Sequence, residues 1–161
     1  MPSPVTESLE SVLKSLLLSA AVTTGLQAGT YYTWASGVMP ELVRLDDRTF
    51  VHAMQQMSRA IVNPVFMASF LGAPLLAAAA GVASSATARP WVLAGAGLAV
   101  ATVAITVAGN VPLNTMLDRA DLAGTTDARR RFEKSWVRLN TTRAVTSTVS
   151  LAALVWAALC A

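Results

Sequence analysis

The chain has 161 residues, of which 54% are hydrophobic and 13% are charged, with a formal net charge of +3 at pH 7. This apolar content is well above what a soluble domain needs for one core, so the composition places the chain in a lipid bilayer. Its single cysteine, Cys160, excludes an intramolecular disulfide or a thiolate cluster.

Four apolar windows in the sequence are long enough to cross a bilayer, which takes about 20 residues of helix. They cover residues 12–31, 62–82, 91–108 and 144–161. We interpret the first window as a retained helix rather than a cleaved signal, because Glu7 and Glu10 precede it and no convincing small-residue cleavage site follows it. The expected fold is therefore all-α, with residues 1–161 forming a single integral-membrane four-helix bundle.

Basic residues are distributed unevenly between the two sides of these windows. The connections after the first and third windows carry ten Lys and Arg residues, whereas the opposite side has only Lys14 and Arg89. Because short loops rich in Lys and Arg stay in the cytoplasm, we expect both termini outside a bacterial inner membrane and the two basic loops in the cytoplasm. This topology accounts for the positive charge, so no nucleic-acid partner is expected.

The first basic connection is expected to form an amphipathic helical extension on the cytoplasmic side. Its apolar residues recur on one helical face: Phe50, Met54, Met57 and Ile61. The opposite face is polar: His52, Gln56, Arg59 and Asn63. Asp46 or Asp47 would be its N-cap, and the helix should continue into the second window with a kink at Pro64. A polar stripe would then run down into the bilayer.

The other three windows carry polar side chains at the same helical spacing. The first has Thr23, Gln27, Thr30 or Tyr31, and Trp34; the third has Thr102, Thr106, Asn110 and Asn114; the last has Trp136, Asn140, Arg143, Ser147 and Ser150. Because polar groups facing lipid are costly, the stripes should converge inside the bundle and line a pocket near its cytoplasmic mouth. Two alternatives stay open: the asparagines serve only as hydrogen bonds between helices, or Arg143 reaches out to the headgroups.

The residue types in these stripes limit the chemistry of the pocket. His52 is the only histidine, and it is the side chain best suited to exchange a proton near neutral pH. No HExxH, CxxC or paired Glu-x-x-His motif occurs, so no metal site is expected, although capture of a metal or haem from a partner stays open. Nucleotide-binding motifs and a nucleophile elbow are absent from the sequence as well.

Four segments together resemble the anthrone oxygenase family of small integral-membrane proteins. They are "GLQAGTYYTWASGVMPEL", "RTFVHAMQQMSRAIVNPVF", "GNVPLN" and "RFEKSWVRLNTTRAVTS". The resemblance extends from about residue 16 to residue 150. Its more specific parts are the Asn-x-Pro-x-Asn unit at 110–114 and the Trp-x-x-x-Asn-x-x-Arg unit at 136–143.

The resemblance implies a cofactor-independent monooxygenase that uses dioxygen to oxidise the central methylene of a polyketide anthrone to a quinone. In that reaction His52 would remove the benzylic proton. The developing oxyanion would be held by four donors: Asn110, Asn114, Asn140 and Arg143. The substrate would be bound by a wider set: Gln27, Tyr31, Trp34, Gln56, Arg59, Asn63 and Trp136.

The expected function is therefore oxidation of a lipophilic phenol or anthrone to a quinone within the membrane. The expected partners are that aromatic small molecule, dioxygen and the lipid bilayer, and no cofactor is expected. Whether the chain forms a homo-oligomer stays open. The alternative is a four-helix membrane protein without enzymatic activity, acting as a lipophile carrier or an accessory subunit, and oxygen consumption distinguishes the two.

Overall fold

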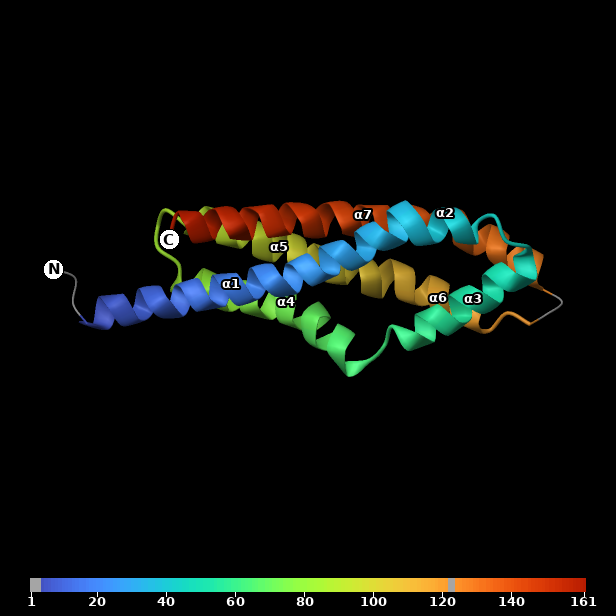
Figure 1. The fold of residues 1–161 in the computed structure, drawn as a ribbon, viewed down its shortest axis with the longest axis horizontal. Coiled ribbons are helices and arrows are strands. Elements are labelled where there is room, and N and C mark those ends of the chain that lie inside the picture. The colour runs from blue at the N-terminus through green and yellow to red at the C-terminus, as the bar shows by residue number, and fades with distance from the viewer. Residues whose placement is uncertain (1–3, 122–123) are drawn as a thin grey trace.

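The computed structural model describes residues 4–121 and 124–161, and every regular element among them is helical (Figure 1). Four helical segments of this described part are long and apolar enough to cross a membrane: Glu7–Leu42, Pro64–Ala83, Arg89–Asp118 and Thr125–Leu159. They confirm the predicted all-α membrane bundle and indicate an integral membrane protein. Residues 1–3 and 122–123 of the predicted single domain lie outside the described part.

The four long segments, and the short helix between the first two, consist of the following helical elements. The first consists of α1 (Pro4–Thr33), the π-helical turn η1 (Trp34–Val38) and α2 (Met39–Leu42). After α3 (Asp47–Ala60) come α4 (Pro64–Ala83) and α5 (Arg89–Ile105), which continues through the π-helical turn η2 (Thr106–Asn110) into α6 (Val111–Asp118). The last helix is α7 (Thr125–Leu159). At 1.5 Å per residue α7 is about 52 Å long, so it extends well beyond a hydrocarbon core of about 30 Å.

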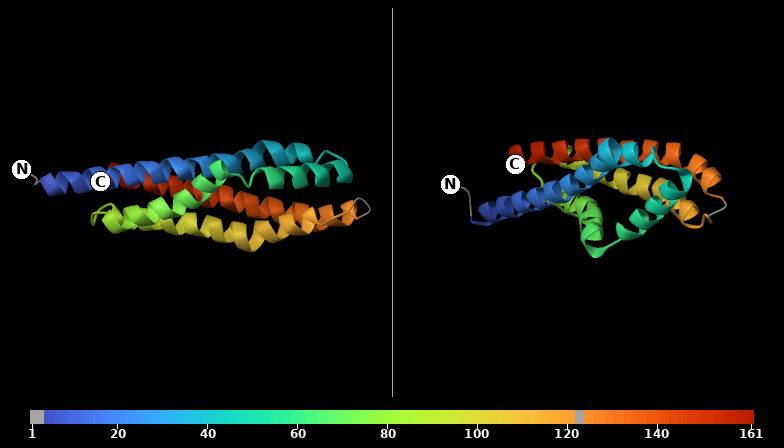
Figure 2. Two further views of the ribbon diagram at one scale, coloured as in Figure 1. Left: turned by 90° about the horizontal axis from the view of Figure 1, so that it is seen from below. Right: turned by 45° about the vertical axis from the view of Figure 1, so that its right-hand side comes forward.

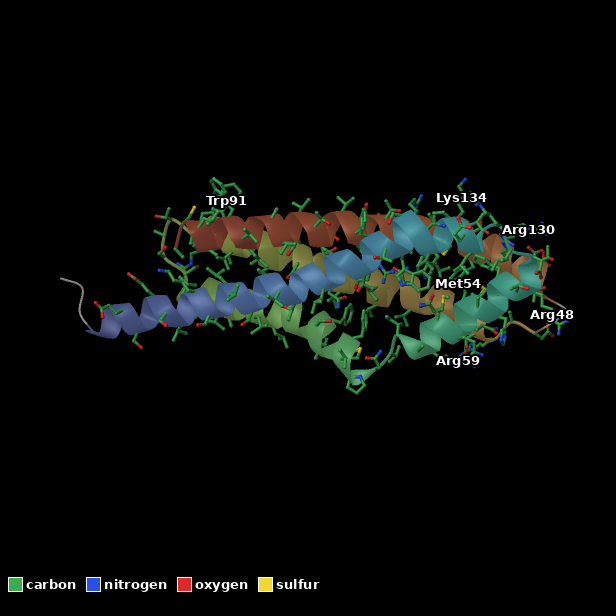
Figure 3. The ribbon with its side chains drawn as sticks, in the orientation of Figure 1. Arg48, Met54, Arg59, Trp91, Arg130 and Lys134 are labelled. Carbon is green, nitrogen blue, oxygen red and sulfur yellow. The ribbon has the colours of Figure 1, made fainter. Side chains whose placement is uncertain are left out.

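The long segments run side by side along the bundle (Figure 2). Helix α1 packs against α4 and α7, and α5 packs against the same two helices. At the end where α1 begins and α7 ends, an apolar cluster that includes Leu17, Val92 and Leu154 fills the centre. At the other end α3 covers a second cluster, which includes Phe50 and Phe132. Charged side chains gather around this second end, which we call the basic end; Arg48, Arg59, Arg130 and Lys134 mark it in Figure 3.

The contact between α5 and α7 depends on a residue without a side chain. A Cβ atom added to Gly95 would lie 2.8 Å from Cγ of Leu154. The close approach lets the Ser150 hydroxyl donate a hydrogen bond of 2.7 Å to the Gly95 carbonyl oxygen. Small residues allow such approach between membrane helices, where packing and hydrogen bonds replace hydrophobic burial.

Both π-helical turns come directly before a proline-containing turn. The amide of Met39 bonds to the carbonyl of Trp34, and the amide of Val111 bonds to that of Thr106, so each turn is one residue wider than an α-turn. Pro40 and Pro112 follow at once. A proline ring crowds the carbonyl four residues before it, and we infer that the wider turn relieves this crowding. Such turns are frequent at functional sites.

The prediction that one helix passes through Pro64 is wrong. Helix α3 ends at Ala60, and Asn63 has an extended backbone, with φ −128° and ψ 161°. The Asn63 side chain accepts a hydrogen bond of 3.0 Å from the Phe66 amide and thus caps α4, with Pro64 as the first helical residue. Proline is favourable there because that amide needs no helical partner. The N-cap prediction for α3 is confirmed at Asp46, which accepts from the Thr49 amide at 3.0 Å.

Candidate functional site

A cavity of about 330 Å³ lies between α1, the α3–α4 connection, η2 with α6, and α7. This volume falls within the range of about 300–1,000 Å³ that is usual for small-molecule sites. Most of its wall is apolar or aromatic: Trp34, Met57, Ile61, Val62, Phe66, Met67, Phe70, Val107, Val111 and Trp136. Its polar wall includes Tyr31, Thr106, Asn110, Asn114 and Arg143. Polar residues from the first, third and last membrane segments therefore meet at the cavity, whereas the fourth expected stripe, on α3, does not reach it.

Arg143 is the charged residue of the cavity wall, and only 7% of it is exposed. Its guanidinium donates to Oδ1 of Asn140 at 2.9 Å and to the Thr106 hydroxyl at 3.4 Å. Its carbon Cζ lies 4.4 Å from the centroid of the Tyr31 ring, in a cation–π contact. Within residues 4–121 and 124–161, no carboxylate forms an ion pair with Arg143. The side chain faces the cavity rather than the headgroups.

Asn110, the last residue of η2, has unused hydrogen-bonding capacity beside the cavity. The residue is 1% exposed, and neither its Nδ2 nor its Oδ1 has a partner among the described residues. In the same part of the chain, Nε of Arg143 is also buried without a partner. A buried polar group without a hydrogen bond costs about 1–3 kcal/mol. Both residues line the cavity, but these atoms are themselves buried, so a ligand would reach them only through a shift of neighbouring side chains.

The other two predicted asparagines position neighbouring side chains. Nδ2 of Asn140 donates to the Tyr31 carbonyl at 3.1 Å while its Oδ1 accepts from Arg143, so both ends of this amide are used. Asn140 does not line the cavity but holds Arg143 against α1. Oδ1 of Asn114 accepts from the indole of Trp136 at 3.0 Å. The Trp136 ring lies 5.2 Å from the Trp34 ring, which gives the cavity an aromatic wall.

A buried chain of hydrogen bonds runs from the cavity wall into α4. The Tyr31 hydroxyl donates to Oε1 of Gln27 at 2.7 Å, and Nε2 of Gln27 donates to the Ser69 hydroxyl at 2.8 Å. Gln27 does not line the cavity itself but contacts Tyr31, which does. The sequence prediction missed Ser69, as well as the stacked pair Phe66 and Phe70, whose rings are 5.6 Å apart. Phe66 and Phe70 are four residues apart on an apolar helix, and this spacing could have predicted that their rings are in contact.

The structure does not bring the polar face of α3 to the cavity. His52, Gln56, Arg59 and Asn63 are all exposed, and none lines the cavity. Arg59 pairs with Asp118 at 2.6 Å, and Asn63 caps α4. Helix α3 turns its face with Phe50 and Met54 inward, and because it ends at Ala60 its polar face does not continue into α4. The roles predicted for these four residues stay predictions that the cavity geometry does not support.

The part of the chain that the structure describes contains no cluster of three or more His, Cys, Asp or Glu residues able to hold a metal ion. A family model described as anthrone oxygenase matches residues 52–153, which is more than half of the chain and includes Asn110, Asn114, Trp136, Asn140 and Arg143. No curated protein matches the chain. No solved structure matches it either.

Proposed function

The chain belongs to the anthrone oxygenase family, and from this premise we propose that it oxidises a lipophilic anthrone or related phenol to a quinone with dioxygen, without a cofactor. Membership of the family indicates an oxygenase-type function. The proposed partners are the aromatic substrate, dioxygen and the bilayer. One observation carries the proposal: Arg143 is buried in the wall of an aromatic cavity, with no carboxylate beside it among the described residues.

A buried arginine needs an anion or several acceptors. Placing an arginine near the centre of a membrane helix costs about 2.5–3.5 kcal/mol on insertion scales. Asn140 and Thr106 supply neutral acceptors to Arg143, but they do not neutralise its charge. A ligand that becomes an anion inside the cavity would do so. Arg143 would thereby favour the deprotonated form of that ligand, because opposite charges attract strongly in an apolar site.

An anthrone suits this arrangement. Loss of a methylene proton gives an aromatic anion whose negative charge rests largely on the oxygen atom across the ring. Arg143 and Asn110 offer donors for that oxygen, and preorganised donors of this kind are usually the largest contribution to catalysis. Trp34 and Trp136 offer flat surfaces for the fused rings. The proposed roles are therefore charge stabilisation and orientation.

The proposed reaction consumes one anthrone and one dioxygen and forms one quinone and one water. The methylene carbon first loses a proton, and the resulting anion transfers one electron to dioxygen. The carbon radical and superoxide then form a C–O bond, and the peroxide takes up a proton. Finally the second methylene hydrogen leaves as a proton, the O–O bond breaks, and the leaving hydroxide becomes water. The two electrons of the broken C–H bond form the second bond of the C=O group.

The first proton acceptor in this proposal is water or hydroxide. Among the described residues of the cavity wall, none is a carboxylate or a histidine. His52 lies on the exposed face of α3, and its role as the base stays a prediction. Because Arg143 stabilises the product of deprotonation, a weak base suffices in this scheme.

The test is oxygen consumption by purified protein with a simple hydroxyanthrone, corrected for oxidation without protein. We expect Arg143→Gln to lower the rate about 100- to 1,000-fold, the usual effect of removing one oxyanion donor. Arg138→Gln, an exposed position on the same helix, is the matched control and should keep the wild-type rate. If Arg143→Gln is as active as the wild type, the proposed role of Arg143 is wrong. If the wild type only binds the compound without consuming oxygen, a lipophile carrier becomes the better description.

A further inference from the structure

The cavity wall has polar residues in its buried part and only apolar residues at its exposed rim. Four wall residues are exposed, and all four are apolar: Met57 (38%), Val62 (69%), Val107 (58%) and Val111 (48%). We call these four residues the mouth. The charged wall residue, Arg143, and Asn110, whose side chain has no hydrogen-bond partner among the described residues, are both buried. A charged group that bound ligands from water would usually lie at an accessible rim, whereas here the rim is apolar and the charged group is buried.

Two of the four mouth residues, Val107 and Val111, lie at a depth that hydrocarbon occupies in a bilayer. Val111 and Val107 precede Asp118 by about two and three helical turns, which is about 10 and 16 Å along the rod formed by α5, η2 and α6. The whole segment Arg89–Asp118 has 30 residues, or about 45 Å. A hydrocarbon core of about 30 Å centred on it would begin about 7 Å from Asp118. Both valines therefore lie inside the half of the core next to the basic end.

The break between α3 and α4 forms one side of the mouth. Helix α3 packs against α6 and α7 near the basic end, whereas α4 packs against α1 and α5. The corner between them stands away from the bundle (Figures 1 and 2). On the side of the mouth toward the basic end, Arg59 of α3 pairs with Asp118 at the end of α6. This ion pair ties α3 to α6 on the side from which water would approach.

From the apolar mouth and its depth, we infer that the cavity opens sideways into the hydrocarbon next to the basic end and takes up an uncharged lipophile dissolved in the membrane. The class of ligand rests on the proposed function, but the direction of the opening does not. The ligand enters with its oxygen-bearing edge first, toward Arg143 and Asn110, and becomes an anion only inside the cavity. A water-soluble, permanently charged derivative of the same rings is not a ligand.

The opening is tested by nitroxide spin labels in vesicles of phosphatidylcholine and phosphatidylglycerol. Cys160 is the only cysteine, so Cys160→Ser gives a background in which Val62→Cys and Val107→Cys are labelled singly. Val100→Cys, exposed on α5 and absent from the cavity wall, is the lipid-facing control, and Arg48→Cys at the basic end is the water-facing control. We expect the labels at 62 and 107 to collide more often with dioxygen than with a water-soluble nickel complex, as at 100. If both labels behave like the one at 48, the inference is overturned.

A second measurement needs no label at the mouth. Of the four tryptophans, Trp91 and Trp156 lie at the opposite end, so replacing both by Phe leaves emission from Trp34 and Trp136 beside the cavity. We expect quenching by phospholipid with brominated acyl chains and little quenching by iodide, and the reverse result overturns the inference. Neither measurement requires oxidation of any substrate, so failure of the proposed enzymatic activity would leave both results unchanged.

Discussion

Replacement of Asn110 by leucine should make the protein more stable and less active. Both polar atoms of the Asn110 side chain are buried without a partner among the described residues. Leucine has a similar branched shape but no polar atom, so it removes the unsatisfied groups. At about 1–3 kcal/mol for a buried group left unsatisfied, the free energy of unfolding should rise by about 1 kcal/mol or more. For a chain of 161 residues the midpoint of thermal unfolding rises about 2–4 °C per kcal/mol.

Asn140→Leu is the matched control for this stability measurement. Asn140 is also about 1% exposed, but its amide bonds to the Tyr31 carbonyl and to Arg143. Its replacement leaves both partners unsatisfied in a buried site, which should lower the unfolding midpoint. The two asparagines lie on adjacent helical segments and undergo the same substitution. Changes of opposite sign in their unfolding midpoints would therefore report the difference in hydrogen bonding.

The assay is thermal unfolding in detergent without ligand, followed by oxygen consumption with a hydroxyanthrone. We expect Asn110→Leu to unfold at a higher temperature than the wild type and to lose activity about 100-fold, because the removed donor acts on the ligand. A fall in the midpoint as large as that of Asn140→Leu would refute the reasoning. Such a fall would mean that the Asn110 amide is satisfied in the folded protein without a ligand.

Two further predictions concern the scaffold. Gly95→Ala places a methyl group 2.8 Å from Cγ of the buried Leu154 and should destabilise the protein by about 1–3 kcal/mol. Gly97→Ala should be neutral or stabilising, because, apart from its own stretch of helix, no atom of the described residues lies within 4 Å of the added methyl group. A calorimetric comparison of the two variants tests whether α5 and α7 approach as described. Hydrogen bonds from the hydroxyl and then the amide of Thr49 hold the pKa of Asp46 below its usual 3.8. The stabilising contribution of Asp46 is therefore complete above its unfolded pKa and declines as the pH falls through the lower, folded value. The difference in unfolding midpoint between wild type and Asp46→Ala should narrow below about pH 4, and a difference that widens on acidification would contradict the assignment of Asp46 as the cap.

Periodicity was sufficient to predict the long helices and one side of the site. Trp136, Asn140 and Arg143 lie on one face of α7 because an uninterrupted helix keeps its phase over many turns. The pattern placed Arg143 on this face but left open whether its side chain turns inward or reaches the headgroups. In the structure it is 7% exposed and lines the cavity. The pattern could not show that the Asn140 amide already forms hydrogen bonds with Tyr31 and Arg143, because the bond to Tyr31 depends on the distance between helices.

The break before Pro64 was harder to predict, because proline is compatible with both a kink and a helix start. The dipeptide Asn63-Pro64 does carry the signature of an N-cap followed by the first helical residue. Interpreting it as a kink kept the polar face of α3 in phase with the membrane span and thus assigned His52 to the pocket. The π-helical turn that ends at Asn110 could not be predicted either, because one extra residue in a helical turn does not require particular residue types.

The central claim is that Arg143 binds the anionic form of an aromatic ligand, and its most direct test is the pH at which a bound hydroxyanthraquinone changes colour on losing its phenolic proton. The compound is already oxidised, so the measurement reports binding and charge without turnover. We expect the colour change of the bound compound to occur at a lower pH in wild-type protein than in empty detergent micelles, and this difference to disappear in Arg143→Gln but not in Arg138→Gln. A colour change at the same pH in wild type and Arg143→Gln, with the compound bound to both, would contradict the account.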